Sequence, residues 1–278
     1  MRSWVLLPAC CLLGACTLFL STDDLHSSTD AGAGAEPRDA SADAPTTPND
    51  GATDATDADP TIPFCARRSS TFCADFGGGT PDEGWSRADI NRGSLDLAVE
   101  GSSAPALRVS LLEGTGDKTA RLHRDLATTP SEVHVELDLL IPEAHPIMRE
   151  LMKLELPTSH ETTAIGYFSS GLQLQLSGDE LRVFVERFDA TGAQHGTAYV
   201  SGKRLPIGAW AHVELDAVLS PSNGSLELKV DGTSAVSRMG IPTLTDKPQG
   251  ARLIVGTFTF DLESASVNLV DNVLLDAK

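Results

Sequence analysis

Regular alternation of apolar and polar residues dominates the chain from residue 64 to residue 278, and it constrains the fold more than any other feature. In residues 133–139, Val-His-Val-Glu-Leu-Asp-Leu, every second residue is apolar. The same pattern recurs in residues 95–100, 172–176, 181–186, 211–216 and 226–230, and residues 253–256 and 270–275 are two further apolar segments. Such spacing places apolar side chains on one face of an extended strand. The sequence therefore predicts many strands, each with one buried face.

Turn-forming residues separate these segments, as at Asn223-Gly224 and Asp231-Gly232. About a dozen short strands with hairpin signals predict an all-β fold, an antiparallel β-sandwich of the jelly-roll type. One segment departs from the alternation. Residues 143–154, whose start is bracketed by Pro142 and Pro146, are predicted to contain a helical turn.

Two neighbouring segments resemble a known family. Gly208-Ala209-Trp210 precedes one strand, and residues 226–232 read Leu-Glu-Leu-Lys-Val-Asp-Gly. This order resembles the central hairpin of concanavalin A-like lectin/glucanase domains of the laminin-G type. Residues 73–77 resemble the first strand of such domains, and residues 270–275 resemble the last. The resemblance implies a concanavalin A-like sandwich with Trp85 and Trp210 in its core.

A change in composition precedes this domain. Residues 21–63 consist mainly of Asp, Ala, Thr, Ser, Pro and Gly, with ten acidic residues against one basic residue. This segment carries about half of the chain's net charge of −18. It cannot offset its ordering entropy by burying apolar surface, so it is predicted to be disordered and extended. The predicted organisation is a signal segment (1–15), an acidic linker (16–63) and one domain (64–278).

The first residues resemble the signal and lipobox of bacterial lipoproteins. An apolar run at residues 4–13 follows the basic start, and it is too short to span a bilayer. Leu-Gly-Ala-Cys at 13–16 closes the run. The resemblance implies cleavage before Cys16 and lipidation of its side chain. Because Thr17 follows, not Asp, we expect an anchor in the outer membrane of a Gram-negative bacterium. An ordinary signal peptide with an incidental Cys16 is the alternative.

Two cysteines, Cys65 and Cys73, remain for the domain. In an exported protein such a pair favours a disulfide, and a metal site would need further ligands nearby.

Two predicted strands come close to the Glu-x-Asp-x-x-Glu motif with which some members of the superfamily cleave β-glucans. One carries Glu136 and Asp138, and the other carries Glu214 and Asp216. Residues two apart on a strand share a face, so each pair can meet a sugar. The final Glu is missing from both, and without it the leaving group has no proton donor. We therefore interpret these acids as the polar face of half-buried strands, and the domain as not an enzyme.

Aromatic residues near predicted loops are the candidates for a sugar-stacking platform. They are Tyr167, Phe168, Phe188 and Tyr199. Because aromatic residues make up only 5% of the chain, the alternative is that these rings cap the sandwich.

One structural calcium is the cofactor considered. Binding modules of this fold often hold calcium between their first and last strands, and Asp75 and Asp271 occupy the matching positions by resemblance. Carboxylate oxygens suit that ion. In the alternative interpretation Asp271 only begins a turn.

The sequence thus predicts a membrane-anchored, non-catalytic domain that binds a glycan or another extracellular partner. A divergent polysaccharide-active glycoside hydrolase or lyase, and a structural envelope protein, are the alternatives. Nucleic acid is excluded as a partner because so acidic a chain repels a phosphate backbone. Motifs such as His-Glu-x-x-His and Gly-x-Ser-x-Gly are missing from the sequence.

Overall fold

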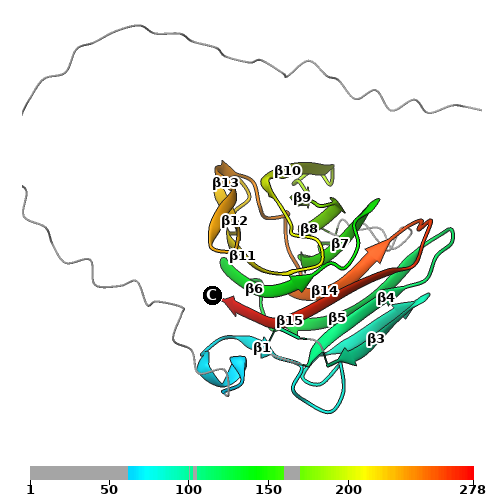
Figure 1. Cartoon of the computed structure of the whole chain (residues 1–278). Helices are drawn as coiled ribbons and strands as arrows, with labels where there is room; N and C mark the ends of the chain where they lie inside the picture. Colours follow the sequence, from blue (N-terminus) through cyan, green and yellow to red (C-terminus); the bar gives the residue numbers. More distant parts are fainter. Residues whose placement is uncertain (1–61, 100, 103–104, 160–169) are drawn as a thin grey trace, which may run out of the picture. The chain divides into compact units, whose positions relative to one another are not determined.

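The computed structural model describes residues 62–99, 101–102, 105–159 and 170–278. Within these residues, fifteen strands form two antiparallel sheets that pack face to face (Figure 1). This confirms the predicted all-β sandwich of jelly-roll type. Among the same residues, no helix is long and apolar enough to cross a membrane. The predictions for residues 1–61, including lipidation at Cys16, lie outside the described part of the chain.

The eight-stranded sheet has the order β13-β12-β11-β6-β15-β4-β3, and β1 pairs with the other end of β15. Its strands are β1 (Phe72–Ala74), β3 (Gly93–Ala98), β4 (Ala106–Leu111), β6 (Glu132–Leu140), β11 (Trp210–Val218), β12 (Gly224–Val230), β13 (Thr233–Ile241) and β15 (Ser266–Ala277).

The seven-stranded sheet has the order β10-β9-β8-β7-β14-β5-β2. Its strands are β2 (Arg87–Asn91), β5 (Lys118–Leu126), β7 (His145–Glu155), β8 (Gly171–Gly178), β9 (Glu180–Phe188), β10 (Gln194–Arg204) and β14 (Ala251–Thr259). One short 3-10 helix, η2 (Phe64–Arg67), precedes β1.

The core lies between the two sheets and follows from the alternation in the sequence. Leu137 and Val213 of one sheet, and Leu174 and Val183 of the other, are fully buried and belong to one cluster. Each fully buried side chain of this size contributes about 1.5–3 kcal/mol relative to an exposed one. Since most strands bury their apolar face in this core, the alternate residues of these strands point outward and are free for other roles.

The predicted helical turn in residues 143–154 is wrong, because this segment forms β7. The strand pairs with β8 on one side and β14 on the other, and both pairings shift register along it. The shift at Glu150 and Met152 breaks the alternation, so the apolar residues no longer recur at every second position. Arg149 is thereby turned into the core, where its Nη1 donates to Ser266 and Asn268.

The N-terminal end of the domain is fixed by a covalent link. Cys65 and Cys73 form the predicted disulfide, with their Cα atoms 5.6 Å apart. Trp85 packs edge-on against Phe72 and is 9% exposed, as expected. Trp210 differs from expectation: it is half-buried on the outer face of the eight-stranded sheet. Side chains alternate between the two faces along β11. Because Ala211 and Val213 point into the core, Trp210 points outward.

Gly256 provides a test of the packing between strands. Its φ is +132°, and a Cβ there would lie 2.3 Å from the carbonyl oxygen of Ala120. We expect Gly256→Ala to lower the free energy of unfolding by about 2–5 kcal/mol, through both strain and overlap. Gly178 has φ +62° but open space around it, so Gly178→Ala should cost only about 1–2 kcal/mol. Equal losses in chemical denaturation would contradict the described backbone at Gly256.

Candidate functional site

A five-residue sequence, His-Val-Glu-Leu-Asp, occurs twice on the eight-stranded sheet, at residues 134–138 of β6 and 212–216 of β11. The two strands are antiparallel neighbours. Their register pairs the outward residues in reverse order: His134 with Asp216, Glu136 with Glu214, and Asp138 with His212. We call these six residues the charge ladder. It contains all four acids that the sequence suggested as sugar-binding or catalytic.

Each carboxylate of the charge ladder has a cationic or imidazole partner. His134 bonds to Asp216 at 2.7 Å and to Glu136 at 2.8 Å, and His212 bonds to Asp138 at 2.7 Å. Two further cations close the set: Arg68 lies 3.2 Å from Glu136, and Lys229 lies 3.5 Å from Glu214 and 3.3 Å from Asp216. The negative charges of the ladder's carboxylates are therefore balanced by side chains of the same chain.

The protonation states agree with this compensation. The hydrogen bond to Glu136 is the main cause that raises the pKa of His134 to about 9, against the opposing effect of burial. Asp138 likewise raises the pKa of His212. The hydrogen bond from His134 lowers the pKa of Glu136. Burial disfavours ionisation of Asp138, but hydrogen bonds from His212, Ser102 and Asn272 outweigh it and lower its pKa. These carboxyl groups are held ionised, which does not suit a proton donor.

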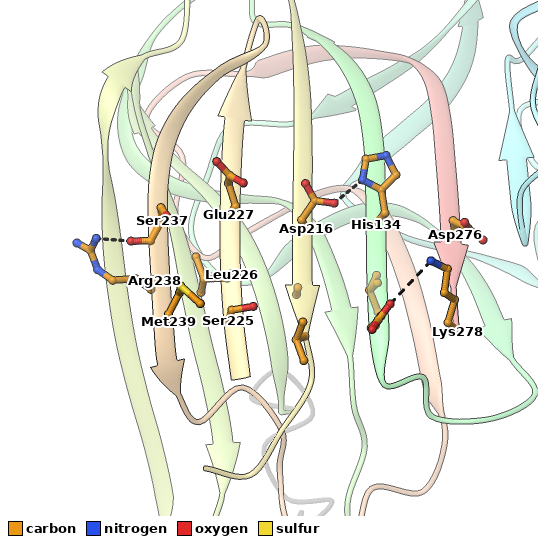
Figure 2. A pocket seen from close by; sticks show the side chains of 14 residues that line it. His134, Asp216, Ser225, Leu226, Glu227, Ser237, Arg238, Met239, Asp276 and Lys278 are labelled. Carbon is orange, nitrogen blue, oxygen red and sulfur yellow. Dashed lines mark hydrogen bonds and ion pairs between the residues drawn. The ribbon is translucent and has the colours of Figure 1, made fainter. Parts of the chain in front are cut away.

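A groove of about 340 Å³ lies beside the ladder on the same sheet. Figure 2 shows its lining, with His134 and Asp216 hydrogen-bonded to each other and Met239 exposed on the opposite side. Lys278 pairs with Glu132 at its rim. None of its lining residues is Phe, Tyr or Trp. This groove therefore lacks the stacking surface that sugars use.

The two acids considered for calcium bond to other groups of the chain. Asp75 accepts hydrogen bonds from the backbone of Cys65 and Gly77. Asp271 is fully buried and accepts one from the hydroxyl of Ser102. Among the described residues, no group of three or more His, Cys, Asp or Glu side chains is arranged to hold a metal ion.

Of the aromatic candidates, Tyr167 and Phe168 lie outside the described residues. Tyr199 is partly buried against the core, with the guanidinium of Arg238 5.5 Å above its ring. Phe188 is half-buried at the end of β9, where its backbone bonds to Thr245. The structure does not bring Phe188 and Tyr199 together in one site.

A different pocket, of about 190 Å³, lies on the outer face of the seven-stranded sheet. It is formed by outward residues of β7, β8, β9, β10 and β14 and by the segment that follows β14. Its lining combines polar and apolar side chains: Met148, Glu150, Gln173, Gln175, Arg182, Phe184, Glu186, Ala198, Phe258, Thr259 and Phe260. A mostly apolar pocket with a few convergent polar groups is the usual form of a ligand site.

The polar groups of this pocket form a continuous hydrogen-bonded row. Arg182 Nε donates to Gln175 at 2.9 Å, Gln175 donates to Gln173 at 2.6 Å, and Gln173 donates to Glu186 at 3.1 Å. Gln194 donates to the other oxygen of Glu186. We call these five residues the polar row. Because each side chain is fixed by its neighbour, the row is rigid before any ligand arrives.

Two carboxyl groups of the pocket differ in environment. Glu186 is 4% exposed, and this burial raises its pKa in spite of nearby Lys153 and the two amide hydrogen bonds. Glu150 is 7% exposed and bonds to the guanidinium of Arg121 at 3.1 Å. A buried carboxyl group with a raised pKa is able to donate a proton near neutral pH. In the pocket, Glu186 fits that role.

A neutral imidazole lies farther along the same face. His123 of β5 is 2% exposed, and burial is the main cause that lowers its pKa to about 4, followed by the charges of Arg87, Arg121 and Arg252. It is therefore uncharged at neutral pH. The sequence did not single out His123 or the polar row. For Gln173, Gln175, Arg182 and Glu186, the one signal was the presence of polar residues at outward positions of two predicted strands, residues 172–176 and 181–186.

No protein-family model matches the sequence, and no curated protein is similar to it in sequence. Solved structures do match the fold. An endo-β-1,4-glucuronan lyase from Trichoderma reesei has a TM-score of 0.66 at 13% identity, with 76% of this chain and 96% of that chain covered.

Two further structures are similar. A mixed-linkage glucan GH16 protein from Bacteroides ovatus has a TM-score of 0.53 at 9% identity, over 73% of this chain and 99% of that one. An alginate lyase from a Chlorella virus has a TM-score of 0.51 at 10% identity, over 70% and 94%. At these identities the likeness shows the fold.

These structures correct one prediction. The domain was predicted not to be an enzyme, because neither Glu-x-Asp segment is complete. Polysaccharide lyases and a glucan-cleaving protein share this fold, so that prediction is contradicted. The reasoning failed because it required the acid and its partner to lie on one strand, whereas neighbouring strands also bring residues together.

The charge ladder generates a prediction on pH. The folded pKa of His134 lies above its ordinary value of 6.5, so its contribution to stability is present below pH 6.5 and is lost as pH rises through about 9. We expect His134→Gln to cost about 1–2 kcal/mol at pH 6, allowing for solvent screening, and much less at pH 10. Urea unfolding at both pH values measures this. A loss of the same size at both would show that His134 acts by packing alone.

Proposed function

We propose that the domain cleaves a polysaccharide that binds across the outer face of the seven-stranded sheet. The observation that carries the proposal is Glu186: a buried carboxyl group with a raised pKa, held by Gln173 and Gln194 in a pocket. Groups with shifted pKa values in a cleft are candidates for catalysis.

The chemistry assigned to Glu186 is proton donation to the leaving glycosidic oxygen. Hydrolysis and elimination both break the bond between that oxygen and carbon. In hydrolysis the carbon gains a hydroxyl group from water, and in elimination the adjacent ring carbon loses a proton as a double bond forms. In both reactions the leaving oxygen must gain a proton. A carboxyl group with a raised pKa keeps its proton to higher pH. Gln173 and Gln194 orient its two oxygens, while Gln175 and Arg182 extend the polar surface along the strands.

The apolar side of the pocket suits the C–H faces of sugar rings. Phe184, Phe258 and Phe260 line it, and Phe260 is 41% exposed. Phe258 and Phe260 pack edge to face, with ring centroids 5.0 Å apart, which fixes their orientation. The groove beside the charge ladder has no Phe, Tyr or Trp in its lining, so the seven-stranded sheet supports the proposal better.

The similar structures support the same function. They are named as lyases acting on glucuronan and alginate and as a protein bound to a glucan product. The likeness itself concerns the fold, so the proposal depends on the pocket's own residues.

We expect Glu186→Gln to lower kcat by about 100- to 10,000-fold, because the amide cannot donate the proton. In the unmodified protein, kcat should fall as pH rises above the pKa of Glu186. A panel of polysaccharides, followed by release of reducing ends and by near-ultraviolet absorbance, measures cleavage and separates hydrolysis from elimination. Only elimination produces an absorbing double bond.

The matched control is Glu180→Gln. Glu180 lies on the same strand, β9, but is exposed and outside the pocket, so activity should be unchanged. Equal activity of Glu186→Gln and the unmodified protein would exclude Glu186 as the proton donor. Absence of cleavage of every polymer in the panel would overturn the proposed function.

We also propose that a lipid on Cys16 anchors the chain and that the acidic linker holds the domain away from the membrane. The support is the lipobox-like sequence at 13–16 and the composition of residues 21–63. A lipid-anchored chain stays on the membrane because each buried methylene of an acyl chain contributes about 0.8 kcal/mol.

Replacing Cys16 by Ala should therefore move the protein from the membrane fraction to the soluble fraction of cells that produce it. Quantitative immunoblotting of the two fractions measures the shift. Continued membrane retention of Cys16→Ala would contradict the lipid anchor, and it would leave the pocket proposal unaffected.

A further inference from the structure

The outer face of the seven-stranded sheet carries several cations, most of which have a carboxylate partner in the chain. Arg121 pairs with Glu150 and Asp89, and Arg252 pairs with Asp125 and Glu155. Among the described residues, Arg182 is a guanidinium inside the pocket that forms no ion pair.

Arg182 is also held in place. Its Nε donates to Gln175 at 2.9 Å, and its Nη2 contacts the sulfur of Met148. Gln175 is itself fixed by Gln173. A guanidinium with a fixed orientation and no anionic partner is suited to binding a planar anionic group, because its N–H groups form a fork that matches a carboxylate.

A second guanidinium that forms no ion pair among the described residues lies on the same face. Arg87 of β2 is exposed and lies 3.5 Å from His123, and its charge also acts on the carboxylate of Asp125. Five strand intervals separate β9 from β2 in the sheet, which corresponds to about 24 Å at the usual spacing of strands. A ligand that contacts both arginines must therefore be a polymer and not a single sugar.

The charge of the chain makes these two cations unusual. The net charge is −18, and the charge ladder of the opposite sheet compensates its own acids with Arg68 and Lys229. Acidic residues outnumber basic residues in this chain by 39 to 21. Leaving Arg182 without an ion pair, inside a pocket lined by phenylalanines, is explained if the ligand brings the negative charge.

We propose that the polymer bound on this face is an anionic polysaccharide and that Arg182 binds its acidic group, as the residue that determines specificity. This rests on the proposed function, and it selects acidic over neutral polymers as substrates. A carboxylate and a sulfate ester offer the same charge to Arg182, and the experiment distinguishes them.

The experiment measures binding and cleavage of three polymers by the unmodified protein and by Arg182→Gln. The polymers are a polyuronate, a sulfated neutral glycan and an uncharged β-glucan. We expect Arg182→Gln to weaken binding and raise KM about 10- to 150-fold for the acidic polymer, as for loss of a hydrogen bond to a charged group. Because this contact binds substrate without changing its proton transfer, kcat should change much less. Affinity for the unmodified protein should fall as salt is added.

Two controls accompany the variant. Arg204→Gln removes an exposed arginine that pairs with Asp179 outside the pocket, so it should bind like the unmodified protein. Arg182→Lys retains charge but loses the fork, so it should recover only part of the affinity. Thermal unfolding of each variant verifies that it is folded.

The outcomes separate the two proposals. Cleavage of the uncharged glucan at least as well as of the acidic polymers, with no effect of Arg182→Gln, overturns the inference and leaves the proposed function standing. Binding of an acidic polymer that depends on Arg182 but gives no cleavage supports the inference and overturns the proposed function. Preference for the sulfated polymer identifies sulfate as the group bound, and preference for the polyuronate identifies carboxylate.

Discussion

The rest of the structure depends on the burial of one face of most long strands in a single core between two sheets. Leu137 and Val213 of one sheet, and Leu174 and Val183 of the other, are fully buried in the core between the two sheets. This requirement fixes the register of each strand, because a shift of one residue would turn the apolar side chains to solvent. It also leaves two outer faces whose residues carry no part of the core, and the proposed site lies on one of them.

The charge ladder and the pocket on the opposite sheet differ in how their charged groups are paired. On the eight-stranded sheet, the repeated His-Val-Glu-Leu-Asp sequence pairs imidazoles with carboxylates across β6 and β11, and Arg68 and Lys229 complete the balance. On the seven-stranded sheet, Glu186 is buried with a raised pKa and Arg182 forms no ion pair. A balanced set stabilises the sheet but offers little to a ligand. A charged side chain without an oppositely charged partner lowers the stability of the fold, and a ligand that supplies the opposite charge offsets this loss.

The candidate site could be predicted only in part. Polar residues at outward positions of β8 and β9 were visible as alternation, yet nothing in the sequence marked Gln173, Gln175 and Arg182 as neighbours in one row. The incomplete Glu-x-Asp segments suggested a site at acids whose charges are balanced in the folded protein by neighbouring imidazole and cationic groups. Trp210 was assigned to the core by resemblance, but its parity on β11 places it outside.

The sequence by itself determined the strands that alternate regularly, their buried faces, the main turns and the disulfide between Cys65 and Cys73, because each follows from local spacing or from the small number of cysteines. Only the tertiary structure decided which outward residues meet. The clearest case is β7, where a register shift at Glu150 turns Glu150 to the pocket and Arg149 into the core, against the alternation of the strand. Such a shift arises from pairing with β8 and β14 together. It depends on residues far apart in the chain, so no local pattern reveals it.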